Sequence, residues 1–506
     1  MQPTTQPAGR SRNTIAHGAT LMVLMRAVSR LIGIFSTAIL ARILTPDDFG
    51  LVVLGTSVLS IAQLLSEVSL GAALIRMRAP TQAHFDTAWT IALLRGALVA
   101  LAVLLSAPYV AAGMHEPRVV PILWMLAATT VIQSFENIRL VDFQIHMQFG
   151  AVFRYQFLTR IVSFLATLAL ALVLRSYWAL ILSSLITAVL TVGYSYVLRP
   201  HRPRLTLAAW RDLFGFSKWA LLGSYLVVTD VYSINFLMGW LGGARALGLF
   251  QVSSQIAALP ASEIAAPIRP PLYAAFARLL DSPAELARTF TEGFGFLFLV
   301  ITPMSLGIFA TAPLLAPLAL GPRWPDAPAM IEAVVFYALF DAFGHYPQNL
   351  FVVMNRQARL IVLGTVFQLV RLPLAIWGGL AGGATGAVYG MVASAVFGFV
   401  FWFAASLPLV RVRPRALVAA TWRTAVAGTV MVAVLLALRR LWPAEPAPAL
   451  LALQLLAFAA LGALLHLGVL LLLWRLSGSP AGAEARALGI AARARDRLFR
   501  LRPAII

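Results

Sequence analysis

Two pairs of charged residues stand inside long apolar runs of this chain. Arg26 and Arg30 are four residues apart in the first run, a spacing that puts both on one face of a helix. Glu263 and Arg269 lie in the stretch LPASEIAAPIRPPLY (259–273), whose prolines remove backbone donors and kink a helix. Charged groups in membrane spans usually face a water-filled cavity or a partner. We therefore expect these four residues to line a substrate-binding cavity.

Each pair has an alternative interpretation. The two arginines could form a structural ion pair with Asp230 or Glu67, and the second pair could be a hinge whose charges pair with each other or reach the headgroups. Asp230, Glu67 and Asp341 are also candidates for cation coupling with H⁺ or Na⁺. Asp341 stands mid-span among aromatic residues, in YALFDAFGHYPQN (337–349), so the alternative for it is a buried, hydrogen-bonded aspartate.

Basic groups outnumber acidic ones by eight to six among all charges inside the apolar runs. The remaining members are Glu67, Arg95, Glu136, Arg154, Arg160, Lys218, Asp230, Glu332, Asp341 and Arg371. A cavity with this excess favours an anionic guest, and the planar fork of arginine suits a phosphate group. We expect Arg95, Arg154 and Arg160 near span ends, with their head groups reaching the lipid headgroups.

The composition of the whole chain requires a membrane. Of 506 residues, 60% are hydrophobic and 11% charged, and the mean hydropathy is +0.85. Soluble domains carry about 25% charged residues. The formal net charge of +20 resembles a nucleic-acid-binding protein, but no soluble basic face is visible, so no nucleic acid is expected. The chain has no cysteine and no hydrolase, ATPase or metal-ligand motif, so we expect no catalytic residue, cofactor or metal ion.

The hydropathy pattern predicts an all-α membrane protein with 14 transmembrane helices, and 12 remains an alternative. The expected spans are 16–43, 49–70, 83–107, 117–138, 149–174, 177–198, 214–241, 246–277, 290–311, 327–353, 358–379, 381–410, 416–441 and 448–475. The proline-rich segment 314–328 is expected to be re-entrant or interfacial.

An internal repeat predicts two pseudo-symmetric lobes. Residues 43–76 resemble residues 240–273, and Gly50-Leu51 corresponds to Gly248-Leu249, 198 positions later. Such repeats enclose a substrate path between them. The expected organisation is a cytoplasmic N-terminus (1–15), an N-lobe of six helices (16–198), a basic inter-lobe loop (199–212), a C-lobe of six helices (213–410), two further helices (411–475) and a basic amphipathic tail (476–506).

The distribution of cations in the loops predicts the orientation of the chain. Cytoplasmic loops of membrane proteins collect Lys and Arg. With both termini in the cytoplasm, 23 cations lie on that side and 7 on the other. The tail alternates arginine and apolar residues at helical spacing, which is typical of a helix on anionic membrane lipids; a solvated tail is the alternative.

Two sequence motifs resemble those of bacterial polysaccharide flippases. The run AILARILTPDDFGLVVL matches an Arg-x-Leu-x-Pro-x-x-[Phe/Tyr]-Gly pattern at Arg42, Leu44, Pro46, Phe49 and Gly50. The run GARALGLFQ matches an Ala-Leu-Gly-Leu-[Tyr/Phe] pattern at Ala246, Leu247, Gly248, Leu249 and Phe250. The chain is thus similar to the Wzx-type branch of the multidrug/oligosaccharidyl-lipid/polysaccharide exporter superfamily.

This resemblance implies a flippase of the bacterial inner membrane. Its expected substrate is an undecaprenyl-diphosphate-linked oligosaccharide, moved to the outer leaflet for exopolysaccharide, capsule or O-antigen biosynthesis. A polysaccharide polymerase and glycosyltransferases are the expected partners. The alternatives are a lipid II flippase, a drug/cation antiporter of the same superfamily and, in another class, a polytopic polymerase or ligase enzyme.

Overall fold

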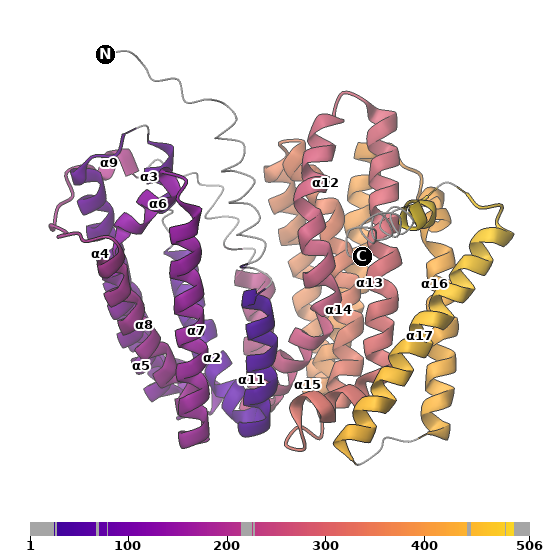
Figure 1. Ribbon diagram of the computed structural model, residues 1–506, viewed down its shortest axis with the longest axis horizontal. Coiled ribbons are helices and arrows are strands. Elements are labelled where there is room, and N and C mark those ends of the chain that lie inside the picture. Colours follow the sequence, from indigo (N-terminus) through magenta and orange to yellow (C-terminus); the bar gives the residue numbers. More distant parts are fainter. Residues whose placement is uncertain are drawn as a thin grey trace, which may run out of the picture. The chain divides into compact units, whose positions relative to one another are not determined.

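The chain folds into helices that form two compact units, residues 1–248 and residues 249–506 (Figure 1). The computed structural model describes residues 25, 28–66, 70–77, 79–213, 225, 228–442, 447–480 and 482–489. All regular structure within these ranges is helical, which confirms the predicted all-α class.

The first unit contains antiparallel long helices joined by short ones. Its elements are a helix over 28–43, α2 (Pro46–Leu65), α3 (Leu70–Arg76), α4 (Gln82–Met114), α5 (Val119–Ser134), η1 (Ile138–Leu140), α6 (Val141–Ile145), α7 (Phe149–Leu174), α8 (Trp178–Leu198), α9 (Trp210–Leu213), η2 (Val228–Tyr232) and the first part of α11 (Ser233–Ala257). Helix α5 packs against α2, α4 and α8, and α7 packs against α8.

The second unit begins within α11. It continues with η3 (Ala261–Ala265), α12 (Ala266–Arg278), α13 (Pro283–Leu320), α14 (Ala327–Val353), α15 (Gln357–Val410), α16 (Pro414–Leu441), α17 (Pro448–Leu476) and a helical turn over 483–489. A cluster of aromatic rings from α12, α13, α14 and α15 forms much of its core, in which Phe294 makes edge-to-face contacts with Phe343 and Phe403 and a tilted contact with Tyr346.

The predicted count of 14 spans is not confirmed. Among the described residues, nine helices are long and apolar enough to cross a membrane, or ten if the bent pair α5 with η1–α6 is one span. The segment 314–328 was expected to be re-entrant or interfacial, and the re-entrant prediction is wrong: α13 continues without a break to Leu320 despite its prolines. Only the short connection 321–326 separates α13 from α14.

Helix α15 is a hairpin rather than one rod. A straight helix of its 54 residues would be roughly 80 Å long, more than twice the ~30 Å hydrocarbon core. Gly382 and Gly383 leave the helical conformation, and Gly383 has a φ of 61°. A Cβ on Gly378 would lie 2.3 Å from the Gly386 carbonyl oxygen, and one on Gly390 would lie 2.2 Å from that of Leu374. The two arms therefore run antiparallel in close backbone contact.

The flippase-like motif of the first unit is the start of helix α2. Thr45 is the N-cap, Pro46 fills the first turn, and Asp48 completes a capping box by accepting hydrogen bonds from the Thr45 backbone N–H and hydroxyl at 2.9 and 2.7 Å. The other Asp48 oxygen accepts a hydrogen bond from the Tyr177 backbone N–H at 2.9 Å. The motif thus fixes where α2 begins and ties it to the α7–α8 turn.

The two glycines aligned by the repeat meet where α2 crosses α11. A Cβ on Gly50 would lie 1.7 Å from the Ala244 carbonyl oxygen, and a Cβ on Gly248 would lie 1.8 Å from the Pro46 carbonyl oxygen. With the repeat offset of 198 residues, Pro46 corresponds to Ala244 and Gly50 corresponds to Gly248. Exchanging the two copies of the repeat therefore converts one of these contacts into the other. Such reciprocal contacts are what a two-fold relation between the copies produces.

We expect Gly248→Ala to destabilise the protein severely, because its methyl group would overlap backbone atoms that cannot move aside. Overpacking a core costs about 1–3 kcal/mol, and this overlap exceeds the usual case. The thermal unfolding midpoint of the purified protein measures the effect. Gly468→Ala is the matched control, since nothing lies within 4 Å of its Cβ position. Equal midpoints for the two variants would contradict the close crossing.

Candidate functional site

The residues expected to bind substrate or couple cations lie in both units. In the first unit, Arg26 and Glu67 are outside the described residues, and Arg30 is exposed on the helix over 28–43. Asp230 lies in η2, which contacts α2.

The remaining three expected residues belong to the second unit. Glu263 is exposed in η3 and accepts a hydrogen bond from the Ser262 hydroxyl at 3.0 Å. Arg269 belongs to α12, which stays helical through Pro270 and Pro271. Asp341 lies on α14, 3.3 Å from the imidazole of His345 one turn later.

Two of these carboxylates share an uncommon backbone setting. Asp230 lies in the π-helical segment Val228–Tyr232, and Glu263 in the π-helical segment Ala261–Ala265. π-Helical turns inside longer helices are rare and occur frequently at functional sites. The predicted break in the proline-rich stretch therefore takes the form of a π-helical turn just before α12.

Two arginines that we expected at span ends lie well inside their helices. Arg95 is the fourteenth residue of α4, about 20 Å from its start at ~1.5 Å per residue, and Arg160 is the twelfth residue of α7. The predicted position near a span end was therefore wrong for both, although α4 and α7 begin within one residue of the predicted starts at 83 and 149. Arg95 instead lines a polar pocket of about 570 Å³ between α2, α4, α5 and α8.

This polar pocket offers both charge and hydrogen-bonding groups inside the first unit. Its lining includes Gln63, Arg95, Thr130, Glu136 and Thr191. The Tyr155 hydroxyl donates a hydrogen bond to Glu136. Within the unit, the pocket can therefore hold a polar or hydrated group between the helices.

A second polar cluster joins α14 to α15 in the second unit. Arg371 is 2% exposed, and its Nη2 donates a hydrogen bond to the Tyr337 hydroxyl at 2.7 Å. Tyr337 stands one turn before Asp341 on α14. Tyr337 could not be selected from the sequence, because its contact depends on the pairing of two helices, whereas His345 stands one helical turn after Asp341, a spacing that the sequence shows.

An apolar groove of about 990 Å³ runs along α13, α16 and α17 in the second unit. Its walls are aliphatic and aromatic side chains, among them Met304, Leu435, Phe458 and Leu467. Leucine and alanine are so common here that the sequence could not identify this groove. A channel of this kind suits a hydrocarbon chain.

The described part of the C-terminal tail contributes Glu484, Ala487 and Leu488 to the lining of this groove. Glu484 lines the groove and is 4% exposed, and its Oε1 accepts a hydrogen bond from Arg423 Nε of α16 at 2.8 Å. Arg486 forms an ion pair with Glu292 of α13. The tail was expected to lie on lipid or in water, but residues 483–489 pack against the protein because this buried pair holds them there.

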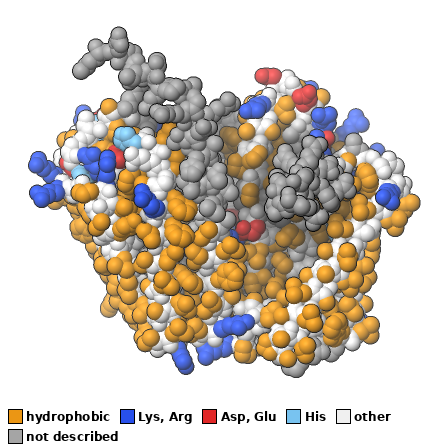
Figure 2. All heavy atoms as spheres, viewed as in Figure 1, with side chains coloured by type: hydrophobic (Ala, Val, Ile, Leu, Met, Phe, Trp, Pro, Cys, Tyr) orange, Lys and Arg blue, Asp and Glu red, His pale blue; other side chains and the backbone are white. Residues whose placement is uncertain are grey.

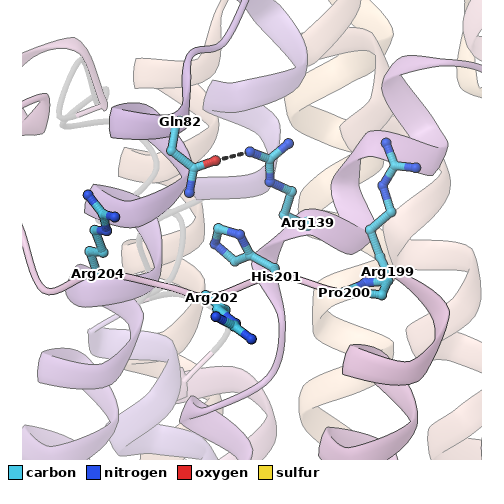
Figure 3. Close-up of a pocket in the computed structure, with 7 residues that line it drawn as sticks. All are labelled: Gln82, Arg139, Arg199, Pro200, His201, Arg202 and Arg204. Carbon is cyan, nitrogen blue, oxygen red and sulfur yellow. Dashed lines mark hydrogen bonds between the residues drawn. The ribbon is translucent and has the colours of Figure 1, made fainter.

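A basic pocket lies at one end of the first unit, outside the spanning helices. It has a volume of about 630 Å³ and is lined by Gln82, Arg139, Arg199, Pro200, His201, Arg202 and Arg204 (Figure 3). Basic side chains gather at this end of the unit, beside α3, α6 and α9, while hydrophobic side chains cover the flank of the long helices (Figure 2).

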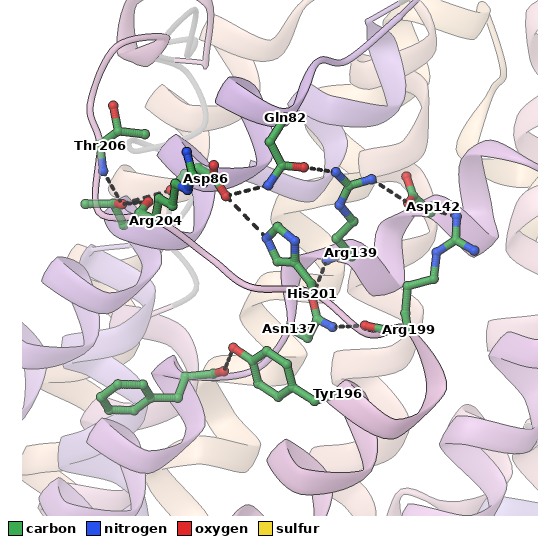
Figure 4. A network of polar contacts seen from close by, with 12 residues as sticks. Gln82, Asp86, Asn137, Arg139, Asp142, Tyr196, Arg199, His201, Arg204 and Thr206 are labelled. Atoms are coloured by element: carbon green, nitrogen blue, oxygen red, sulfur yellow. Dashed lines mark hydrogen bonds and ion pairs between the residues drawn. The ribbon is translucent and has the colours of Figure 1, made fainter.

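Two buried aspartates organise the basic pocket (Figure 4). Asp142 Oδ2 lies 3.5 Å from Arg139 Nη1 and 3.3 Å from Arg199 Nη2. Asp86 Oδ1 accepts a hydrogen bond from Gln82 Nε2 at 2.9 Å and lies 3.3 Å from His201 Nε2. Since buried carboxylates require partners, this network holds the guanidinium groups of Arg139 and Arg199 in place.

Backbone hydrogen bonds attach the pocket's loop to the neighbouring helices. The Thr206 backbone N–H donates to the Thr90 hydroxyl at 3.1 Å, and the Ala209 backbone N–H donates to the Thr87 hydroxyl at 3.2 Å. The Asn137 side-chain amide donates to the Arg199 carbonyl at 2.5 Å. The loop over 199–209 is therefore held against the helices of the first unit by hydrogen bonds along its length.

Protonation of His201 is disfavoured within this network. Burial, and next the positive charge of Arg139, lower the pKa of His201, while Asp86 and Asp142 oppose this shift. The unfolded chain takes up a proton near pH ~6.5, above the lowered pKa of the folded loop. The contribution of His201 to the stability of the fold is therefore fully present above pH ~6.5, and it is lost as the pH falls through the lowered pKa of His201 in the folded protein.

We expect the thermal unfolding midpoint of the purified protein to fall between about pH 7.5 and about pH 5. Part of this decrease should come from His201, so His201→Gln should show a smaller decrease over the same interval. An identical decrease in the variant and the parent protein would contradict the lowered pKa.

Among the described residues, no group of three or more His, Asp or Glu side chains is placed to hold a metal ion. The described residues form three sites that suit binding. These are a cationic pocket at one end of the first unit, a polar pocket among its helices, and an apolar groove in the second unit.

Comparison with known proteins gives a consistent result. A family model described as "Polysaccharide biosynthesis protein" matches residues 39–329. The chain is similar to the lipopolysaccharide biosynthesis protein WzxC of Escherichia coli (strain K12), with 20% identity over 370 residues, covering 71% of this chain and 74% of that protein.

Two solved structures share the fold at low sequence identity. The lipid II flippase MurJ in an inward closed conformation has a TM-score of 0.68 at 12% identity, covering 90% of this chain and 99% of that one. An inward-facing multidrug resistance MATE family transporter of the MOP superfamily has a TM-score of 0.57 at 13% identity, covering 76% and 94%.

Proposed function

The chain belongs to the polysaccharide biosynthesis protein family of the multidrug/oligosaccharidyl-lipid/polysaccharide exporter superfamily, and on this premise we propose which substrate it moves. The protein is a multi-pass membrane transporter of polysaccharide biosynthesis. We propose that it flips undecaprenyl-diphosphate-linked oligosaccharide units from the inner to the outer leaflet of a bacterial inner membrane, with both termini in the cytoplasm.

The apolar groove of the second unit is the observation that carries this proposal. A lipid-linked oligosaccharide has a long hydrocarbon chain, a charged diphosphate and a polar glycan, and each part needs a different environment. The groove along α13, α16 and α17 suits the hydrocarbon chain. A hydrated cation gains nothing from an apolar groove, so this feature favours a substrate with a hydrocarbon part over a cation.

The diphosphate needs cationic partners, because moving it unpaired into hydrocarbon costs many kcal/mol. We assign this role to Arg26, Arg30 and Arg269, with Glu263 orienting the site. The excess of basic over acidic groups in the apolar runs supports an anionic substrate. Alternation between inward-open and outward-open states would carry the diphosphate past the bilayer centre.

The alternatives differ in what they require. A lipid II flippase shares the fold, and only the identity of the transported glycan separates it from the proposal. A polymerase or ligase needs a sizeable outer loop to hold the sugars. Two described connections lie at the end of the first unit that is opposite its basic pocket. Residues 115–118 join α4 to α5, and residues 175–177 join α7 to α8, so both connections are short. This favours a transporter.

We expect Arg30→Ala and Arg269→Ala each to reduce glycan export at least about tenfold, since each loses a charge-assisted partner worth more than ~1.4 kcal/mol. Lysine at either position should restore export poorly, because it cannot donate two parallel hydrogen bonds. Export is measured by complementation of a deletion strain. Arg359→Ala, an exposed arginine on α15, is the control. Normal export with equal protein levels in both alanine variants would remove the arginines from the site.

Asp341, Asp230 and Glu67 are the carboxylates that we propose for coupling to H⁺ or Na⁺. Asp341 is the best placed for a test, because its neighbour His345 can share a proton with it. In proteoliposomes, Asp341→Asn should abolish the response of transport to an imposed pH or Na⁺ gradient. A response equal to that of the parent protein would exclude Asp341.

A further inference from the structure

The basic pocket of the first unit has more positive charge than its own carboxylates neutralise. Four arginines line it, and the two buried aspartates of its network engage Arg139, Arg199 and His201. Arg202 and Arg204 are exposed and form no ion pair with any carboxylate among the described residues. The pocket therefore keeps two guanidinium groups available for an anion from outside the chain.

The other two guanidinium groups are held in position before any ligand arrives. Arg139 lies 4.4 Å from the ring centre of Phe85 and donates a hydrogen bond to Gln82. Arg199 lies 5.9 Å from the ring centre of Phe143. Because contacts with aromatic faces and carboxylates limit their motion, less entropy is lost when an anion binds.

The flank of the pocket is built to lie at a bilayer surface. The same loop exposes Leu205 and Leu207, and Trp210 follows as the first residue of α9, with exposed fractions of 73%, 47% and 47%. Tryptophan and leucine next to arginine are typical of segments in the membrane interface. A soluble phosphate compound gains nothing from the two exposed leucines, whereas a lipid bilayer would cover them.

We propose that the basic pocket binds the phosphate group of a membrane lipid and thereby holds the loop over 199–209 at the bilayer surface. The site lies in the loop and helix ends, separate from the intramembrane arginines assigned to transport. Phosphate suits it because arginine donates two parallel hydrogen bonds to phosphate oxygens. The phosphate could come from an anionic phospholipid or from an isoprenyl diphosphate, and the two sources can be separated by experiment.

The test measures lipid binding to the full chain in mild detergent by native mass spectrometry. The probes are dioleoylphosphatidylglycerol, farnesyl diphosphate and dioleoylglycerol, which has no phosphate. The double variant Arg202→Gln/Arg204→Gln should weaken binding of a phosphate-bearing probe about thirtyfold. Each single variant should weaken it about fivefold. Both side chains lie outside the aspartate network, so the variants keep its ion pairs. Arg211→Gln is the matched control, because Arg211 is exposed on α9 near the same end but does not line the pocket.

A selective loss for dioleoylphosphatidylglycerol assigns the site to phospholipid, and a selective loss for farnesyl diphosphate assigns it to an isoprenyl diphosphate. The proposal is overturned if neither probe loses affinity, if Arg211→Gln has the same effect, or if dioleoylglycerol loses affinity equally. Because binding and not transport is measured, the result is independent of the proposed function.

Discussion

The close crossing of α2 and α11 is the constraint on which the first unit depends. Gly50 and Gly248 let two backbones approach to a distance at which any side chain would overlap a carbonyl oxygen. The N-cap at Thr45 sets where α2 begins, and the buried hydrogen bond from Asn235 to Ser57, 2.9 Å long, holds the register beyond the crossing. η2, which carries Asp230, immediately precedes α11 and contacts α2, so the crossing also positions this carboxylate.

The low dielectric of the bilayer explains how the other charges are arranged. Two of the arginines in the long helices have polar partners: Arg371 has Tyr337, and Arg439 has Glu332 at 2.8 Å. In the basic pocket, outside the spans, arginines exceed carboxylates. The second unit contributes the apolar groove. A lipid-linked glycan needs an apolar environment for its hydrocarbon chain and cationic partners for its diphosphate, and the proposed function assigns these roles to the apolar groove and to the arginines inside the apolar runs.

Much of the fold could be predicted from the sequence, and the reasons for the rest are physical. Composition required membrane helices, and the Gly50 and Gly248 motifs aligned two segments that do meet in space. Helix boundaries were less accurate, because prolines that suggested a break within 314–328 are tolerated inside α13, and α4 continues to Met114, beyond the predicted end at residue 107. The apolar groove and the pairing of Glu484 with Arg423 could not be found, since both depend on which helices pack together.

The sidedness of the lipid-linked oligosaccharide in cells depleted of this protein tests the central claim most directly. Spheroplasts labelled with a lectin report how much of the glycan faces outward, and extraction reports the total. The account predicts that the lipid-linked oligosaccharide accumulates while its outward-facing fraction falls toward zero. An outward-facing fraction equal to that of undepleted cells would contradict the assignment of this chain as the flippase.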